Sequence, residues 1–302
     1  MAVERQHYVP RGYLKGFAIE DTENDNLIWA YEKMPDRRPR KVSVKSVCWE
    51  PYYYEQEKED GYKDTDTIEL TIAQNIENVV LPIIRNLNPV IGSPINLSEE
   101  DRGKVAYFLG LTLTRVPSFR EPIRKFHTKI AQALLDRVTR ADPKAREFLE
   151  KYGVFAEAKS WASLRPMADV ADAISYSAIE KNWQFFVPPE GFSLVTSDNP
   201  VIFGTGLIHL SIEAGPAHPF AELVMNLRKD LALVCTPKKG FNQGAVFSLS
   251  PHEARKFNRG VVQAARRFVF CDHYSPKMDG FVKKYIGQEQ TIVIDGRNLT
   301  TG

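Results

Sequence analysis

The apolar run from Val105 to Thr114 constrains the fold more than any other stretch, because a charged residue follows it at once. The run VAYFLGLTLT is apolar on nearly every helical face, which predicts a helix buried on all sides. At about 100° per residue, Arg115 falls between Leu111 and Phe108, on a face that should be packed. A buried guanidinium needs an anionic partner. The partner is either a carboxylate of this chain, giving a structural ion pair, or an anionic ligand, giving a binding site.

The first half of the chain is mainly helical by pattern. A helix is predicted over residues 66–87, and Glu77 lies at the edge of its apolar stripe. Glu77 is therefore the first candidate within the chain for pairing with Arg115. The helix that contains the apolar run begins at the N-cap Ser98, and Pro117 ends it. Further helices are predicted over residues 118–140, from residue 142, and over residues 167–182.

The second half has the pattern of strands joined by turns. Short apolar runs are separated by Pro, Gly and Asn, and a capping box at Ser250 begins one long helix. Residues 27–33 and 40–47 predict a hairpin, and a further strand could follow from Gln290. We expect one α+β domain over residues 1–302, with a helical layer packed on an antiparallel sheet from the C-terminal half. Its parts are an arm and hairpin (1–60), a mainly helical region (61–182) and a mainly β region (183–302).

Composition excludes few classes of protein. The 302 residues are 43% hydrophobic and 26% charged, and the net charge of +2 is too small to indicate nucleic-acid binding by itself. The distant cysteines Cys48, Cys235 and Cys271 indicate neither a disulfide framework nor a zinc site. Because no long apolar segment occurs, we expect a cytoplasmic protein without membrane contact. The sequence assigns no cofactor and leaves the oligomeric state open.

The N-terminal segment QHYVPRGYLKGFA predicts a structured arm, because its aromatic and aliphatic residues can anchor it to the body. Anchoring would hold His7, Tyr8 and Arg11 in fixed positions. A basic cluster follows in the hairpin. It is most simply a solvated surface, and nucleic-acid contact is the alternative interpretation. Its residues are Arg37, Arg38, Arg40, Lys41 and Lys45.

The segment TSDNPVIF places Ser197, Asp198 and Asn199 in a tight turn between strands. Either the turn caps its own backbone, or it projects a carboxylate and a carboxamide into a cleft. Several catalytic motifs are absent from the sequence. Ser-Asp-Asn lacks the S-x-x-K and K-T-G of β-lactamases, His252 lacks the second histidine of H-E-x-x-H, and no G-x-S-x-G, P-loop or G-x-G-x-x-G occurs. The six histidines are dispersed, so no metal site is predicted.

Five segments together resemble the family called domain of unknown function 4238, uncharacterised microbial proteins with HYVP and SDNP motifs. The segments are HYVPRGYLKGF, TRVPSFR, TSDNPV, LRKDLALVCTP and FNRGVVQAARRFVF. The resemblance runs from Gln6 to about Phe270 and lends a pattern without a reaction. The family usually has Arg-Thr-Pro where this chain has Arg115-Val116-Pro117, so we assign no role to position 116. The motif positions that it implies are His7, Tyr8, Pro10, Arg115, Pro117, Ser197, Asp198, Asn199, Pro200 and Asn258.

Two functions fit these residues. The first is a hydrolase or nuclease for a phosphodiester, a nucleotide or another anionic small molecule. In it His7 is the general acid or base, Arg115 holds the anion, and Asp198 orients the imidazole or binds a metal. The second is a non-catalytic module that binds nucleic acid or protein, in which the same residues are structural. In the first case Tyr8, Arg11, Asn199 and Asn258 would contact substrate, and Glu77 and Ser197 would support the site.

Overall fold

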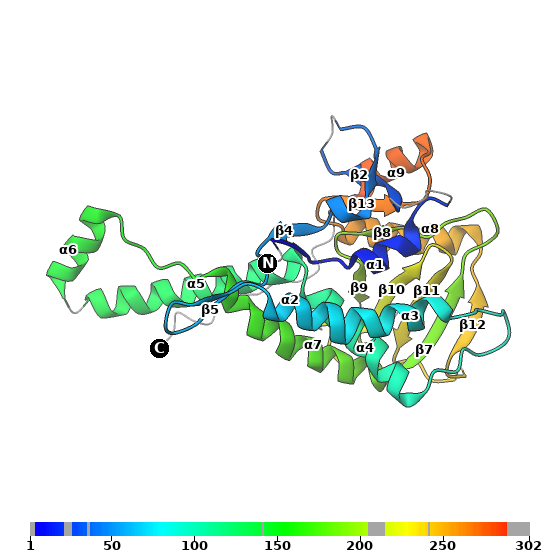
Figure 1. Ribbon diagram of the computed structural model, residues 1–302, viewed down its shortest axis with the longest axis horizontal. Helices are drawn as coiled ribbons and strands as arrows, with labels where there is room; N and C mark the ends of the chain where they lie inside the picture. The colour runs from blue at the N-terminus through cyan, green and yellow to red at the C-terminus, as the bar shows by residue number, and fades with distance from the viewer. Residues whose placement is uncertain are drawn as a thin grey trace.

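The chain folds as an α+β protein, as the sequence predicts. A computed structural model describes residues 4–20, 26–34, 37–140, 142–204, 215–240 and 242–288. Figure 1 shows helices α2, α3, α4 and α7 along the lower side of the body and strands β7, β10, β11 and β12 at one end. The strand predicted from Gln290 lies outside the described residues. In the described residues, no helix has both the length and the apolar character needed to cross a lipid bilayer.

The larger sheet has five strands in the order β12-β7-β11-β10-β9. Its strands are β7 (Asn182–Val187), β9 (Val201–Gly204), β10 (Glu222–Arg228), β11 (Leu231–Thr236) and β12 (Ala245–Ser248). Neighbouring strands are antiparallel except β12 and β7, which are parallel. The prediction of an antiparallel sheet from the C-terminal half is therefore right for four strands and wrong for the edge strand β12.

A second sheet has four antiparallel strands in the order β3-β2-β13-β8. Its strands are β2 (Leu27–Glu32), β3 (Arg40–Ser43), β8 (Thr196–Ser197) and β13 (Phe268–Cys271). The predicted N-terminal hairpin thus pairs with strands from the far end of the chain. Two small ladders complete the strands: β1 (Arg5–His7) with β4 (Trp49–Pro51), and β5 (Gln56–Glu57) with β6 (Lys63–Asp64).

The helices follow the predicted caps. Ser98, Asp142 and Ser250 each accept a hydrogen bond from the first turn of their helix, and Ser250 forms the predicted capping box. The α-helices are α1 (Arg11–Leu14), α2 (Thr67–Thr71), α3 (Asn78–Asn86), α4 (Glu99–Thr114), α5 (Pro117–Arg140), α6 (Pro143–Tyr152), α7 (Leu164–Ile179), α8 (Pro251–Ala264) and α9 (Pro276–Tyr285). The 3-10 turns are η1 (Lys15–Phe17), η2 (Val44–Ser46) and η4 (Ser160–Ser163).

The helix predicted over residues 66–87 is present but not uniform. A π-helical segment, η3 (Ile72–Glu77), joins α2 to α3, and Glu77 is its last residue. Such wider turns are rare and occur often at functional positions. Here the segment ends at the carboxylate that meets Arg115, at 2.8 Å.

The apolar helix α4 lies in close contact with α7 and is almost wholly buried after Lys104. The closest approach is at Gly110, where an added Cβ atom would lie 2.4 Å from the carbonyl oxygen of Ala171. The absence of a side chain is therefore what allows the two helices to touch. The largest hydrophobic cluster includes this contact and also takes in Leu14 from the N-terminal arm and Leu233 from the larger sheet.

Substitution Gly110→Ala should destabilise the fold by about 1–3 kcal/mol, the usual cost of overpacking a core. The matched control is Gly103→Ala on the same helix, where an added Cβ has no neighbour within 4 Å. That change should stabilise the protein by about 0.5–1 kcal/mol, because glycine weakens a helix interior. Urea unfolding of both variants measures the difference, and equal effects would contradict the close approach of the two helices.

Candidate functional site

The arm that carries His7 is held as strand β1 against β4, with His7 opposite Trp49. The residues on either side of β4, Cys48 and Tyr52, have positive φ angles of 54° and 51°. Left-handed backbone is uncommon for residues with side chains. The chain therefore turns sharply at both ends of β4, a feature that the sequence pattern did not indicate.

Arg115 is 1% exposed, and its guanidinium contacts three groups of the protein. Its Nη1 donates to Glu77 Oε1 at 2.8 Å, its Nε donates to the Tyr54 hydroxyl oxygen at 3.0 Å, and its Nη2 donates to the carbonyl of His7. The Tyr54 hydroxyl donates to the same carbonyl at 3.2 Å. The ion pair with Glu77 is the one that the helical pattern indicated. Arg115 therefore joins the N-terminal arm, the turn that contains Tyr54, and η3 at one point.

A second carboxylate, Glu69 on α2, also lies near the charge of Arg115. Burial raises the pKa of Glu69 to about 7, against the opposing attraction of Arg115. The like charge of Glu77 contributes to this rise, and the backbone N–H of His7, which donates to the carboxylate, opposes it. Its Oε2 atom is buried and has no hydrogen-bond partner within the described ranges. Glu69 therefore titrates near neutral pH, and sequence reasoning missed it because it lies two helical turns from Glu77.

The imidazole of His7 is buried, and its Nε2 lies 3.3 Å from the carbonyl oxygen of Lys45. Burial, together with the positive charges of Arg11 and Arg115, lowers the pKa of His7 to about 4, against the hydrogen bond to Lys45. The ring is therefore neutral at physiological pH. General acid–base catalysis works best with a pKa near the working pH, so this environment does not favour the predicted catalytic role.

The carboxylate of Asp198 binds the backbone between α8 and β13. Its Oδ1 accepts from the N–H of Arg266 at 2.9 Å, and its Oδ2 accepts from the N–H groups of Arg267 and Phe268 at 2.7 and 3.1 Å. Burial raises the pKa of Asp198 to about 6, and these three hydrogen bonds oppose the rise. Both carboxylate oxygens are therefore occupied by protein groups.

The amide side chains of the motif also bind backbone. Asn199 donates through Nδ2 to the carbonyl of Ala264 at 3.0 Å, and its own N–H donates to Ser197 Oγ at 3.1 Å. Asn258 on α8 holds the segment 193–195 by accepting from one backbone N–H and donating to one carbonyl, both at 3.0 Å. Of these contacts, only the one between Asn199 and Ser197 is local, as in a turn that caps its own backbone. The others bind backbone 63 to 65 residues away along the chain.

The predicted residues therefore lie in two networks. His7, Arg115 and Glu77 make the first, and Ser197, Asp198, Asn199 and Asn258 make the second. In the described part of the chain, no hydrogen bond or ion pair joins Asp198 to His7 or Arg115. Tyr8 lies between the networks, with its ring 5.6 Å from that of Tyr53 and its pKa raised by burial and by the charges of Cys48 and Asp198. Arg11 is exposed at the start of α1.

A cavity of about 190 Å³ opens beside Tyr53 and Pro117, the proline of the Arg115-Val116-Pro117 motif. The two arginines on its wall already contact protein groups: Arg120 donates to the carbonyl of Tyr53 at 2.7 Å, and Arg124 pairs with an exposed glutamate. Glu121 also pairs with an arginine. Glu50 is the charged side chain on this wall without an ion-pair partner among the described residues, and burial together with Glu121 raises its pKa. The available charge here is negative, which does not suit an anionic ligand.

One group of metal-ligand type escaped the sequence pattern, because Cys271 and His273 are only two residues apart. With Asp272, their donor atoms lie within 4.8 Å of one another. These atoms already have partners: Cys271 Sγ donates to the His273 carbonyl at 2.8 Å, and His273 Nδ1 lies 2.6 Å from Asp272 Oδ1. Burial raises the pKa of the Cys271 thiol to about 12. A buried, protonated thiol is a poor metal ligand, so the group does not fit a metal centre.

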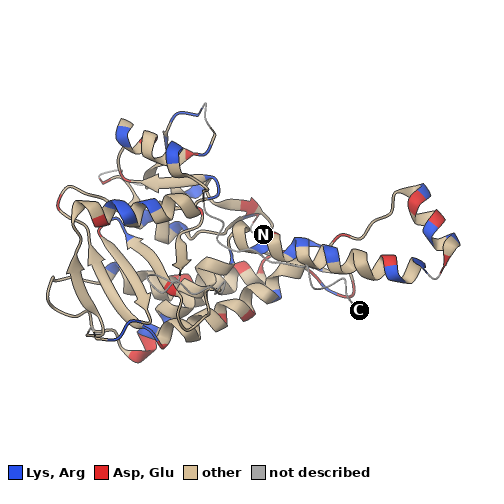
Figure 2. Ribbon diagram, turned by 180° about the vertical axis from the view of Figure 1, so that it is seen from behind, with Lys and Arg blue, Asp and Glu red and all other residues tan. Residues whose placement is uncertain are grey.

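Positive charge is concentrated in a part of the fold that we call the basic lobe, residues 27–46 and 250–288. These residues include 14 Lys and Arg but only five Asp and Glu, a formal charge of +9 in a chain of net charge +2. All fourteen basic side chains are exposed, whereas Glu32 is buried. Figure 2 shows Lys and Arg along α8, α9 and the β2–β3 hairpin, which lie together in the upper part of the view.

Some of these charges hold the lobe together. Glu32 pairs with Arg37 at 3.2 Å, Arg40 at 3.1 Å and Arg267 at 2.7 Å, which ties the hairpin to the start of β13. Others have no acidic partner at ion-pair distance in the ranges that the structure describes. These are Lys33, Arg38, Lys41, Lys45, Arg255, Lys256, Arg259, Lys277 and Lys284. The lobe therefore keeps a large unpaired positive charge, which the small net charge of the chain conceals.

The basic lobe also contains a largely apolar cavity of about 250 Å³, beside α8 and α9. Apolar and aromatic side chains line it together with two basic residues, one histidine and the motif residue Asn258. The lining includes Phe192, Arg255, Asn258, His273, Lys277, Met278 and Phe281. The amide of Asn258 is already bound to the backbone of residues 193 and 195. It therefore holds this segment in place beside the cavity.

These observations define a class of α+β protein in which an N-terminal arm, a buried arginine at a helix end and a Ser-Asp-Asn-Pro turn are each tied into the backbone. The chain belongs to the family described as protein of unknown function (DUF4238), whose model matches residues 5–274. The match confirms the resemblance drawn from the motifs. No curated protein and no solved structure matches the chain.

Substitution Arg115→Lys should destabilise the protein by about 1–3 kcal/mol, because lysine keeps the charge but lacks the planar fork of donors that reaches Glu77, Tyr54 and His7. Tyr54→Phe removes one acceptor of the same guanidinium and should cost about 1–3 kcal/mol. The control Arg146→Lys changes an exposed ion pair and should alter stability by less than about 0.5 kcal/mol. Urea unfolding provides the measurement. Unchanged stability in Arg115→Lys would mean that Arg115 is not structural.

His7 should make folding stability depend on pH. Its folded pKa of about 4 lies below the ordinary value of 6.5, so the unfolded chain takes up the proton first as pH falls. The stability from neutral His7 is complete above about pH 6.5 and is lost toward pH 4, by about 2 kcal/mol between pH 7 and pH 5. The variant His7→Gln should lose this part of the pH dependence in urea titrations, whereas the exposed control His252→Gln should keep it. Parallel curves for wild type and His7→Gln would contradict the prediction.

Proposed function

We propose that the chain is a binding module that contacts nucleic acid through the basic lobe. The observation that carries this proposal is the formal charge of +9 on residues 27–46 and 250–288, with every basic side chain exposed. Lysine and arginine clustered on one part of a fold release counterions from a phosphate backbone, which provides affinity without any base contact. The cytoplasmic setting expected from the sequence fits this role.

Hydrolysis of an anionic substrate through His7, Arg115 and Asp198 is the alternative. It requires the three side chains to reach one substrate. Arg115 instead donates to three protein groups, and both oxygens of Asp198 accept from backbone. The one unpaired charge beside the motif, among the residues that the structure describes, is the carboxylate of Glu50, which would repel an anion. We therefore favour binding, with the motif residues as scaffold.

Two features of the lobe favour a single strand over a duplex. The rings of Trp29 and Tyr274 lie 5.2 Å apart, Tyr274 is exposed, and Lys41 lies over Trp29 at 5.6 Å. Aromatic side chains among cations stack on unpaired bases. The neighbouring cavity of about 250 Å³ is smaller than the roughly 300–1,000 Å³ of sites for drug-sized ligands. It therefore suits one base, with Arg255 and Lys277 near the attached phosphate.

The test is fluorescence anisotropy with a labelled single strand of about 20 nucleotides, long enough for the usual site sizes, over a series of salt concentrations. The variant Arg255→Gln/Lys256→Gln/Lys277→Gln should bind more weakly. Its salt slope should fall by about one for each phosphate that the variant no longer neutralises. The matched control is Lys15→Gln/Arg165→Gln/Lys239→Gln, which removes the same charge from exposed residues outside the lobe.

The control variant should bind as wild type does, and a duplex of the same sequence should bind more weakly than the single strand. An absence of binding at low salt would contradict the proposal. Equal reductions of affinity in the two triple variants would also contradict it, because the affinity would then follow net charge and not the lobe.

A further inference from the structure

The end of α5 and the whole of α6 form an arm, residues 125–156, that extends away from the body (Figure 1). Past Arg120, the only residue of α5 that is buried in the described structure is Thr139, and α6 has none. Helices as short as the ten residues of α6 are marginal in water unless an apolar face is covered. The arm therefore has little internal packing to hold it in place.

Large apolar side chains are concentrated on this arm. Six of the 17 exposed large apolar residues of the described chain lie between residues 134 and 155, with exposures from 46% to 72%. They are Leu134, Val138, Phe148, Tyr152, Val154 and Phe155. Scattered exposed apolar residues are ordinary, but several on one projecting element mark an interaction surface.

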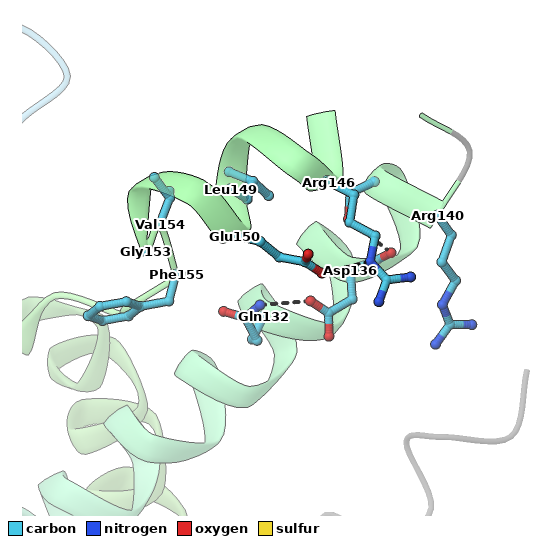
Figure 3. A pocket seen from close by; sticks show the side chains of 10 residues that line it. Gln132, Asp136, Arg140, Arg146, Leu149, Glu150, Gly153, Val154 and Phe155 are labelled. Carbon is cyan, nitrogen blue, oxygen red and sulfur yellow. Dashed lines mark hydrogen bonds and ion pairs between the residues drawn. The ribbon is translucent and has the colours of Figure 1, made fainter. Parts of the chain in front are cut away.

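The space between α5 and α6 is a polar groove of about 570 Å³. Figure 3 shows Gln132, Asp136, Arg146 and Glu150 around it, with charges of both signs. Gln132 donates to Asp136 at 2.7 Å, and Arg146 pairs with Glu150 at 2.9 Å. Acidic and basic side chains are thus interspersed along the two helices that also carry exposed apolar residues.

This charge pattern identifies the partner. Residues 132–155, the part of the arm that carries the exposed apolar side chains, contain five Lys and Arg and four Asp and Glu. This part of the arm is therefore nearly neutral and offers little to a nucleic acid or to a strongly charged protein. A surface with charges of both signs can be complementary to a second copy of itself, because a two-fold axis that sets an acidic residue opposite a basic one forms the same pair twice. The arm also extends from the body, so two arms can meet without contact between the bodies.

We propose that the arm is a dimerisation element, in which the arms of two copies of this chain pack side by side about a two-fold axis. The six exposed apolar side chains between residues 134 and 155 form the buried core of this interface. Charged residues such as Arg146 and Glu150 form its rim. This proposal does not depend on nucleic-acid binding, because none of the residues of the arm belongs to the basic lobe.

Sedimentation velocity of the full chain over a range of concentrations tests the proposal. Wild type should sediment as a dimer that dissociates on dilution. Each of Phe148→Glu and Phe155→Glu should weaken dimerisation by at least about tenfold, because a charge would enter the core of the interface. The matched control Tyr176→Glu changes a side chain that is equally exposed on α7, outside the arm, and should leave the dimer intact. Far-UV circular dichroism checks that each variant is folded.

A wild-type chain that remains a monomer at all concentrations would overturn the proposal. If a chain without residues 289–302 then formed a dimer, the apolar surface of the arm would be covered by residues 289–302 in the full chain. That outcome would also overturn the proposal for the full chain. A dimer that neither arm variant weakens would show that the interface lies elsewhere. Nucleic-acid affinity measured on the same variants distinguishes this failure from failure of the proposed function.

Discussion

The structure depends on one buried cation. A guanidinium without water is costly unless all of its surroundings are arranged to receive it. Arg115 meets a carboxylate, a phenol oxygen and a main-chain carbonyl, and these three come from segments far apart in the chain. The N-terminal arm is therefore positioned by the end of a helix more than a hundred residues later. Burial of Arg115 and placement of the N-terminal arm therefore depend on each other.

Asp198, Asn199 and Asn258 likewise join segments that are distant in the chain, at a second point in the fold. The turn after β8 holds the connection from α8 to β13, and Asn258 on α8 holds the segment that leads into β8. Each of these contacts satisfies a backbone group that would otherwise be buried without a partner. These polar side chains thus hold distant backbone segments together. Two surface features, the basic lobe and the helical arm of residues 125–156, carry the proposed contacts with other molecules.

Local patterns in the sequence were enough to predict many of the structural elements and one of the contacts of Arg115. The caps at Ser98, Asp142 and Ser250, the N-terminal hairpin and the pairing of Glu77 with Arg115 all follow from helical or strand periodicity over a few turns. Helix α9 was missed, although Ser275 followed by proline repeats the signal seen at Ser250.

Other features were beyond such reasoning because they depend on contacts between distant segments. The role of Tyr54 as a partner of Arg115, the π-helical turn before Glu77 and the parallel pairing of β12 cannot be deduced from neighbours in sequence. The same holds for the low pKa of His7, since its burial is set by the fold. The basic lobe was visible only in part, as five residues of the hairpin, because its other half lies over two hundred residues further on.

The basic lobe has a consequence for the rest of the molecule. With +9 confined to 59 residues, the remaining residues carry a formal charge of −7. The protein is therefore an electrical dipole, and a net charge near zero describes neither end of it. In the field of a polyanion such a molecule experiences a torque as well as an attraction. It turns its basic end toward the polymer before contact, while the acidic body is held away, so orientation is selected during the approach.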